Sequence, residues 1–124
     1  CALPICWIAF YKNDLEAIID MKQPTEISSV GISALVEKGD WVFGPRKFVV
    51  SISEDGKNFK EIAKEEYPEM TLANPNQIYD HTLTFDPVKT QYIKVYVQPE
   101  HKLPSWHGGK GLPAYIFVDE ITVK

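Results

Sequence analysis

Lys47-Phe-Val-Val-Ser-Ile-Ser-Glu-Asp-Gly56 is the stretch that decides the fold. Polar and apolar residues alternate toward its end, which predicts a half-buried β-strand over Lys47–Ser53. Glu54-Asp-Gly56 is a turn signal, because glycine readily adopts the positive φ that tight hairpin turns require. The stretch therefore predicts a strand that ends in a hairpin turn.

Short strands of this kind, separated by turn residues, recur along the whole chain. Helical periodicity is weak, and no internal repeat is evident. The expected strands are Leu15–Asp20, Ile27–Leu35, Lys47–Ser53, Phe59–Ala63, His81–Phe85, Tyr92–Val97 and Tyr115–Val123. A set of about seven short strands with turns between them predicts an all-β fold, either an antiparallel β-sandwich or a jelly roll.

Length and composition are typical of one soluble globular domain. At 124 residues the chain fits a single domain over 1–124 that can bury its own core. The net charge of −4 argues against nucleic acid and anionic membranes as partners. The opening CALPICW lacks the basic start of a signal peptide, and no apolar run is long enough to span a bilayer. The two cysteines, Cys1 and Cys6, form neither a disulfide framework nor a zinc ligand set.

The connections between the expected strands are of two kinds. If consecutive strands run antiparallel, alternate connections lie at opposite ends of the sandwich. The short links Met21–Glu26, Glu54–Asn58 and Asp86–Thr90 then share one end. The other end receives the long connections Cys6–Asp14, Val36–Pro45, Lys64–Asp80 and Gln98–Ala114. Long loops without secondary structure of their own are commonly functional, so this loop-rich end is where we expect a site.

Many aromatic side chains fall at the loop-rich end, including all three tryptophans. The set is Trp7, Phe10, Tyr11, Trp41, Phe43, Tyr67, Tyr79, Trp106 and His107. Some of these side chains will cap the core, and burial is the expected fate of Trp7. The set is larger than capping requires, so the sequence predicts an aromatic rim that binds a ligand.

Catalytic patterns do not occur in the sequence. Asp119 and Glu120 are neighbours on an expected strand, so they point to opposite faces and cannot work as a glycosidase pair. No G-x-S-x-G, H-E-x-x-H or phosphate-loop pattern is present, and His81, His101 and His107 lack metal-ligand spacing. We therefore expect no catalytic residues and no enzyme activity from this domain.

Sugar binding suits the residues of the rim better. Aromatic faces pack on the C–H face of a sugar ring, and polar side chains hydrogen-bond to its hydroxyls. The expected platforms are Trp41, Phe43 and Trp106, and the polar candidates are His107, Arg46, Asn13, Asn74 and Glu37. The alternatives are that Trp106 plugs the end of the core and that Arg46 is a surface residue opening a strand.

Several segments resemble discoidin-like domains, also called coagulation factor 5/8 type C domains, in that family's order. They are Trp7–Phe10, Asp14–Asp20, Ile27–Val30, Trp41–Pro45, Val50–Phe59, Tyr92–Val95 and Phe117–Ile121. The most specific pieces are the turn S-x-D-G-x-x-F and the final F-x-D-E-I. More narrowly, W-V-F-G-P and P-S-W-H-G-G-K-G resemble the C-terminal accessory domain of bacterial β-N-acetylhexosaminidases (chitobiases) of glycoside hydrolase family 20, especially from gut Bacteroidetes.

The resemblance implies a galactose-binding-domain-like jelly roll, often a carbohydrate-binding module of family 32, in a secreted, periplasmic or cell-surface glycosidase. It implies no required cofactor, although relatives often bind a structural calcium beside an N-terminal loop and a glutamate that Glu120 matches. The usual upstream L-x-D-G strand is missing. We therefore expect a domain trimmed at its N-terminal edge and excised from a larger multidomain enzyme.

Two functions remain open from the sequence. In the first, the domain is not catalytic and weakly binds a glycan of the N-acetylhexosamine or galactose type through its aromatic rim. In the second, it packs against the catalytic barrel of its parent and has no ligand of its own. Exposure of Trp41 and Trp106 around a concave site favours the first function, and their burial favours the second.

Overall fold

The computed structural model describes residues 2–11, 14–68, 70–71, 74–109 and 111–124, with side chains except at 2–11, 40, 117, 119 and 120. Its strands are β1 (Ala2–Tyr11), β2 (Leu15–Leu35), β3 (Lys47–Ser53), β4 (Lys60–Glu66), β5 (Ile78–Gln98) and β6 (Tyr115–Val123). One short 3₁₀ helix, η1, covers Lys38–Asp40. No helix within these ranges is long and apolar enough to cross a bilayer.

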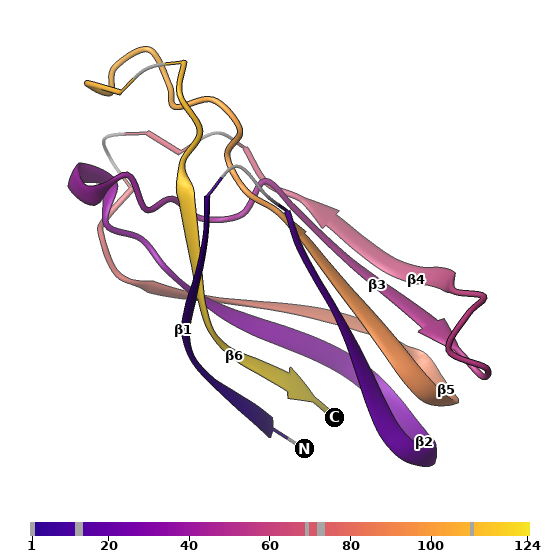
Figure 1. Ribbon diagram of the computed structural model, residues 1–124. Coiled ribbons are helices and arrows are strands. Elements are labelled where there is room, and N and C mark those ends of the chain that lie inside the picture. Colours follow the sequence, from indigo (N-terminus) through magenta and orange to yellow (C-terminus); the bar gives the residue numbers. More distant parts are fainter. Residues whose placement is uncertain (1, 12–13, 69, 72–73, 110) are drawn as a thin grey trace.

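Two long strands, β2 and β5, shape the molecule. The strand order is β1-β6-β2-β5-β3-β4, and every neighbouring pair is antiparallel. β2 and β5 pair from Leu15 with Val97 to Leu35 with Ile78, and both bend sharply midway (Figure 1). Because they bend together, one hydrogen-bonded sheet folds into two layers. One layer holds β1, β6 and residues 27–35 and 78–88, and the other holds β3, β4 and residues 15–20 and 92–97.

The core lies between the two layers. Along β5, buried and half-buried residues alternate with exposed ones from Ile78 to Phe85, as expected for a strand with one face inside. One cluster of buried side chains joins both layers, including Val30, Ile32, Leu83, Ile116 and Val118 from the first and Phe48, Val50, Ile93, Val95 and Val97 from the second. The predicted all-β antiparallel sandwich is therefore confirmed.

Two of the expected strand boundaries were wrong because of the bends. Leu15–Asp20 and Ile27–Leu35 are the two halves of β2, and His81–Phe85 and Tyr92–Val97 both lie within β5. The bends coincide across the ladder, so Thr25 still pairs with Thr90 and the strands continue through them. The strand expected at Phe59–Ala63 is shifted slightly and runs from Lys60 to Glu66.

The N-terminal segment was also predicted wrongly. Of the long connection expected over Cys6–Asp14, residues 6–11 are instead the end of β1, which pairs with β6 from Ile8 opposite Val118 to Tyr11 opposite Tyr115. The segment is apolar up to Tyr11 and has no turn residue there, so it can extend the sheet beyond β6. The side chains of Trp7, Phe10, Tyr11 and Cys6 lie outside what the structure describes, as do Cys1 and Asn13 altogether.

The three short connections and three of the four long ones lie at opposite ends, as predicted. Pro24, Glu54, Lys89 and Thr90, from three short links, line one common hollow. Segments 36–45, 64–80 and 98–114 gather at the other end, where the loops are drawn in purple, pink and orange (Figure 1). Backbone hydrogen bonds join these segments, for example from Val36 N–H to the Gln77 carbonyl (2.9 Å) and from Tyr67 N–H to the Arg46 carbonyl (2.9 Å).

Candidate functional site

A small second core occupies the loop-rich end, and we call it the loop core. Buried Phe43, Leu103 and Ala114 form its centre, and half-buried Trp41, Met70 and Trp106 pack against them. The Phe43 and Trp106 rings stack with centroids 5.9 Å apart and planes 25° apart. The structure therefore brings together the three expected platforms, which come from connections about sixty residues apart in the chain.

The platforms differ in how much surface they offer. Phe43 is completely buried, so its ring packs in the loop core and presents no face to a ligand. Trp41 and Trp106 are half-buried. A Cβ atom at Gly109 would lie 2.7 Å from Cζ2 of Trp41, so the Gly109 backbone already covers part of that indole. Sugar stacking on Trp41 or Trp106 stays a prediction.

The His107 ring joins two of the long connections. Its Nδ1 accepts a hydrogen bond from Gly109 N–H (2.9 Å), so the ring proton lies on Nε2, which donates to the Lys38 carbonyl (2.6 Å). The ring edge also faces Trp41 and Phe43. Both ring nitrogens are used inside the protein, so His107 holds the loops in position.

Arg46 lies beside the loop core in a polar groove, which we call the Arg46 groove. Its Nη1 donates to both oxygens of the buried Glu100 carboxylate (2.9 and 3.2 Å), and its Nε donates to the Tyr67 carbonyl (2.9 Å). The groove has a volume of about 520 Å³ and is lined by Arg46, Lys47, Glu66, Tyr67, Pro68, Gln98 and Glu100. Arg46 is thus a fixed, partly exposed cation with its partner carboxylate, rather than a free surface residue.

Tyr67 and Pro68 also line a smaller hollow, which we call the aromatic notch. It has a volume of about 150 Å³ and is lined by Gly44, Pro45, Tyr67, Pro68, Met70, Asn74, Tyr79 and His81. The His81 ring lies 4.6 Å from the Tyr67 ring and 6.5 Å from the Tyr79 ring, centroid to centroid. The notch therefore combines aromatic walls with two prolines, a methionine and a few polar groups.

Two polar atoms of the notch residues have no partner. The Tyr67 hydroxyl and His81 Nε2 are both buried, and neither makes a hydrogen bond within the described part of the chain. Burial lowers the pKa of His81, and burial together with the adjacent Glu65 carboxylate, which approaches the Tyr67 hydroxyl without hydrogen-bond geometry, raises that of Tyr67. Buried polar groups are nearly always hydrogen-bonded, so an unpaired donor and acceptor at a hollow point to a missing partner.

The buried His81 ring makes stability depend on pH. Its pKa is lowered from 6.5 mainly by burial, although Glu65 and Asp80 act in the opposite direction. The folded state then binds fewer protons than the unfolded state. Above the unfolded pKa, His81 is neutral in both states and costs no stability. As the pH falls below that pKa, protonation of His81 in the unfolded state lowers the free energy of unfolding. We expect the free energy of unfolding to decrease between about pH 7 and about pH 5, measured by urea denaturation. His81→Phe should remove that part of the slope, and an unchanged slope would contradict this assignment.

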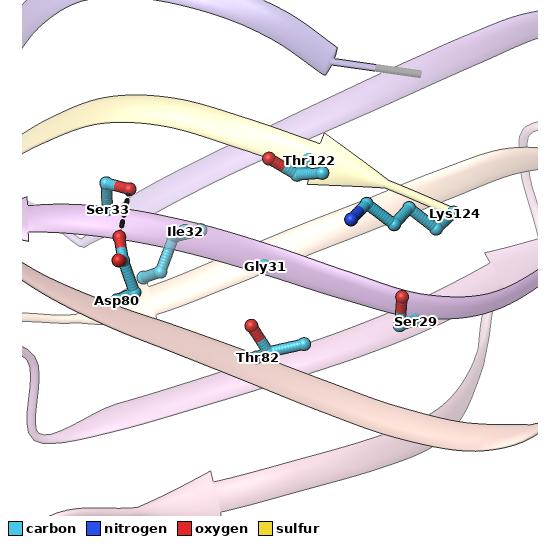
Figure 2. A pocket seen from close by; sticks show the side chains of 8 residues that line it. All are labelled: Ser29, Gly31, Ile32, Ser33, Asp80, Thr82, Thr122 and Lys124. Carbon is cyan, nitrogen blue, oxygen red and sulfur yellow. Dashed lines mark hydrogen bonds between the residues drawn. The ribbon is translucent and has the colours of Figure 1, made fainter.

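A third hollow, on the outer face of the first layer, has a different character. Figure 2 shows its small polar side chains on β2, β5 and β6, with Ser33 Oγ donating to Asp80 Oδ1 (2.5 Å). Its volume is about 440 Å³, and its lining contains no aromatic ring. Without an aromatic face it lacks the platform for a sugar ring, so we use its residues below as controls.

Of the remaining predicted candidates, Asn74 lines the notch, and its Oδ1 accepts a hydrogen bond from Thr71 N–H (2.8 Å). Glu37 is exposed, and its backbone forms an isolated bridge with Val42. His81 and Met70 were not among the predicted site residues. His81 belongs to an expected strand. The one sequence signal for its position is the alternation along β5, which puts His81 on the inward-facing side.

The sequence matches the F5/8 type C domain family over residues 6–116. The chain belongs to this family. The resemblance to discoidin-like domains is thereby confirmed, and the S-x-D-G-x-x-F turn at Ser53–Phe59 has the expected glycine at φ 77°. No curated protein matches the chain.

Solved structures of carbohydrate-binding modules and of a chitobiase domain share the fold of this F5/8 type C domain. CpGH89CBM32-5 from Clostridium perfringens, in complex with GalNAc-β-1,3-galactose, is 18% identical with a TM-score of 0.56, over 87% of this chain and 63% of its own. The C-terminal domain of a chitobiase from Bacteroides fragilis is 22% identical with a TM-score of 0.50, and the match covers 90% of this chain and 66% of that domain's chain. The CBM32 of AlyQ, in complex with 4,5-unsaturated mannuronic acid, is 13% identical with a TM-score of 0.53, over 94% and 74%. The chain thus spans slightly under two thirds of the first two structures.

The calcium expectation stays a prediction. Across the described ranges, no group of three or more His, Cys, Asp or Glu side chains is placed to hold a metal ion. The side chain of Glu120, which the resemblance assigns to that site, lies outside the description. We therefore derive no step through a metal.

Proposed function

We propose that this F5/8 type C domain binds a glycan, without catalysing its cleavage, at the loop-rich end of the sandwich. The observation that carries the proposal is an aromatic notch beside the Arg46–Glu100 pair, two of whose lining residues, Tyr67 and His81, each bury a polar atom that has no hydrogen-bond partner among the described residues. Aromatic walls next to a few fixed polar groups suit a ligand with an apolar face and many hydroxyls. Arg46 serves as a donor to these hydroxyls, and the half-buried Trp106 extends the surface.

We further propose the setting of the domain. The ligand is a glycan of the N-acetylhexosamine or galactose type, and the parent is a secreted, periplasmic or cell-surface β-N-acetylhexosaminidase of family 20 from a Bacteroidetes species. The chitobiase domain and the GalNAc-β-1,3-galactose complex among the similar structures support this setting. A site of this size is expected to bind weakly, with a Kd of roughly 0.1–1 mM.

A structural role is the second candidate. Phe43 is fully buried, and the half-buried Trp41 and Trp106 pack against the buried residues of the loop core. These observations favour the loop core as a rigid support, whose outer surface packs against the catalytic domain of the parent. In that case the groove and the notch have no ligand.

Binding by the 124-residue chain to a glycan array, followed by calorimetry on the best ligands, tests the proposal. We expect Tyr67→Ala to weaken binding at least tenfold, because Tyr67 lines both the groove and the notch. Trp106→Ala measures how much the predicted aromatic rim contributes to glycan affinity. Thr82→Ala, on the outer-face hollow, is the control and should leave affinity unchanged. Failure to bind any N-acetylhexosamine or galactose glycan, or an equal loss in the control, would overturn the proposal.

A further inference from the structure

Resting on the proposed function, we infer that the aromatic notch is a subsite for an acetamido group, so the domain selects N-acetylated sugars over their plain hydroxyl counterparts. Of the two glycan types in the proposed function, N-acetylhexosamine and galactose, the inference selects the N-acetylhexosamine type. The inference rests on the size of the notch, on its lining, on its two unpaired polar atoms and on the charge of the adjoining groove.

The size of the notch suits a substituent rather than a whole sugar. Its volume of about 150 Å³ corresponds to roughly five water molecules in the liquid. Pockets that enclose whole small-molecule ligands usually exceed about 300 Å³. The Arg46 groove, at about 520 Å³, shares Tyr67 and Pro68 with the notch and is large enough for the ring that carries the substituent.

The lining of the notch suits a methyl group. Pro45, Pro68, Met70 and the faces of Tyr67 and Tyr79 are apolar contact surfaces. The Tyr79 hydroxyl is already engaged, because it donates to the Pro75 carbonyl (2.8 Å). A methyl group packed against these walls gains from burial, whereas a hydroxyl in its place gains nothing from them.

The two unpaired atoms suit an amide next to that methyl group. A phenol hydroxyl can donate or accept, and the neutral imidazole Nε2 can do either depending on the tautomer, so together they match one N–H and one C=O. Both atoms are buried in the free protein, so the amide reaches them only when the side chains that line the notch move. Met70 lines the same notch, and although its Sδ accepts a hydrogen bond from Gly44 N–H (3.4 Å), an unbranched thioether can adjust its shape to an entering group.

The adjoining groove argues for a neutral sugar. Arg46 and Lys47 supply two positive charges, and Glu66 and Glu100 supply two negative charges, so the lining has no net charge. Arg46 is already neutralised by Glu100 at 2.9 Å. A uronate or sialate would find no cation in the groove lining that lacks a carboxylate partner. The hydroxyls of a neutral ring, by contrast, can hydrogen-bond to both Arg46 and Glu100.

Calorimetric titration of the chain with matched methyl glycosides tests the inference: GlcNAc against glucose, and GalNAc against galactose. We expect the acetamido member of at least one pair to bind at least tenfold more tightly. Tyr67→Phe removes only the hydroxyl and should reduce that ratio to about threefold or less, because one hydrogen bond is lost. The same variant should not lower thermal stability, since the hydroxyl makes no hydrogen bond to any residue that the structure describes. Ser33→Ala, on the outer-face hollow, is the control and should keep the ratio.

The outcomes separate this inference from the proposed function. Equal affinity within both pairs, or an unchanged ratio in Tyr67→Phe, would overturn the acetamido subsite but leave glycan binding intact. Binding of the 6-deoxy sugar fucose as tightly as GlcNAc and GalNAc would also overturn it, because a methyl group alone would then explain the notch. No binding by any of these sugars would overturn the proposed function itself.

Discussion

Gly109→Ala is expected to lower the free energy of unfolding by about 1–3 kcal/mol, the usual cost of inserting a methyl group into a well-packed core. A Cβ atom there would lie 2.7 and 2.9 Å from Cζ2 and Cε2 of Trp41 and 2.9 Å from Cδ1 of Leu103. The indole cannot simply swing away, because Trp41 packs on the loop core and its ring faces the His107 edge. Urea denaturation followed by tryptophan fluorescence measures the loss.

Gly108→Ala is the matched control, because a Cβ atom at Gly108 meets nothing within 4 Å. We expect its free energy of unfolding to stay within about 0.5 kcal/mol of the parent value. Equal effects of the two substitutions would show that the glycines matter for loop flexibility rather than for packing against Trp41. A change in tryptophan emission confined to Gly109→Ala would place the perturbation in the loop core.

Local pattern was enough to predict the strands but not their continuity. The alternation of Lys47–Ser53 and the turn at Gly56 were read correctly, because both depend only on neighbouring residues. The merging of strands into β2 and β5 depends on two bends lying opposite each other, where Thr25 pairs with Thr90. That pairing joins residues far apart in the chain, and no local signal records it.

For the candidate site too, the sequence was enough to predict the location of residues but not their burial. Counting antiparallel strands correctly placed Trp41, Phe43, Trp106 and His107 at one end, and the structure brings them into contact. Burial could not be read from the sequence, because it depends on how Leu103, Ala114 and Gly109 pack around the rings. The notch was missed in part for a related reason, since His81 comes from a strand while Tyr67 and Met70 come from a loop.

Arg46→Met is expected to lower the free energy of unfolding by about 2–3 kcal/mol, because it leaves the Glu100 carboxylate buried without its partner. This is less than for a fully buried pair, since 35% of the Arg46 side chain is exposed and water screens that end. The lost hydrogen bond from Nε to the Tyr67 carbonyl contributes to the effect. Urea denaturation of the 124-residue chain gives the value.

The double variant Arg46→Met with Glu100→Met separates the ion pair from the packing of its side chains. Two apolar side chains of similar length remove the unpaired charge, so the double variant should regain most of the stability that Arg46→Met loses. The coupling energy from the four-protein cycle should exceed about 1 kcal/mol. Additive losses would instead mean that Glu100 finds water once Arg46 is gone. The carboxylate would then be accessible from the Arg46 groove, and the pair would not be what fixes Arg46 in place.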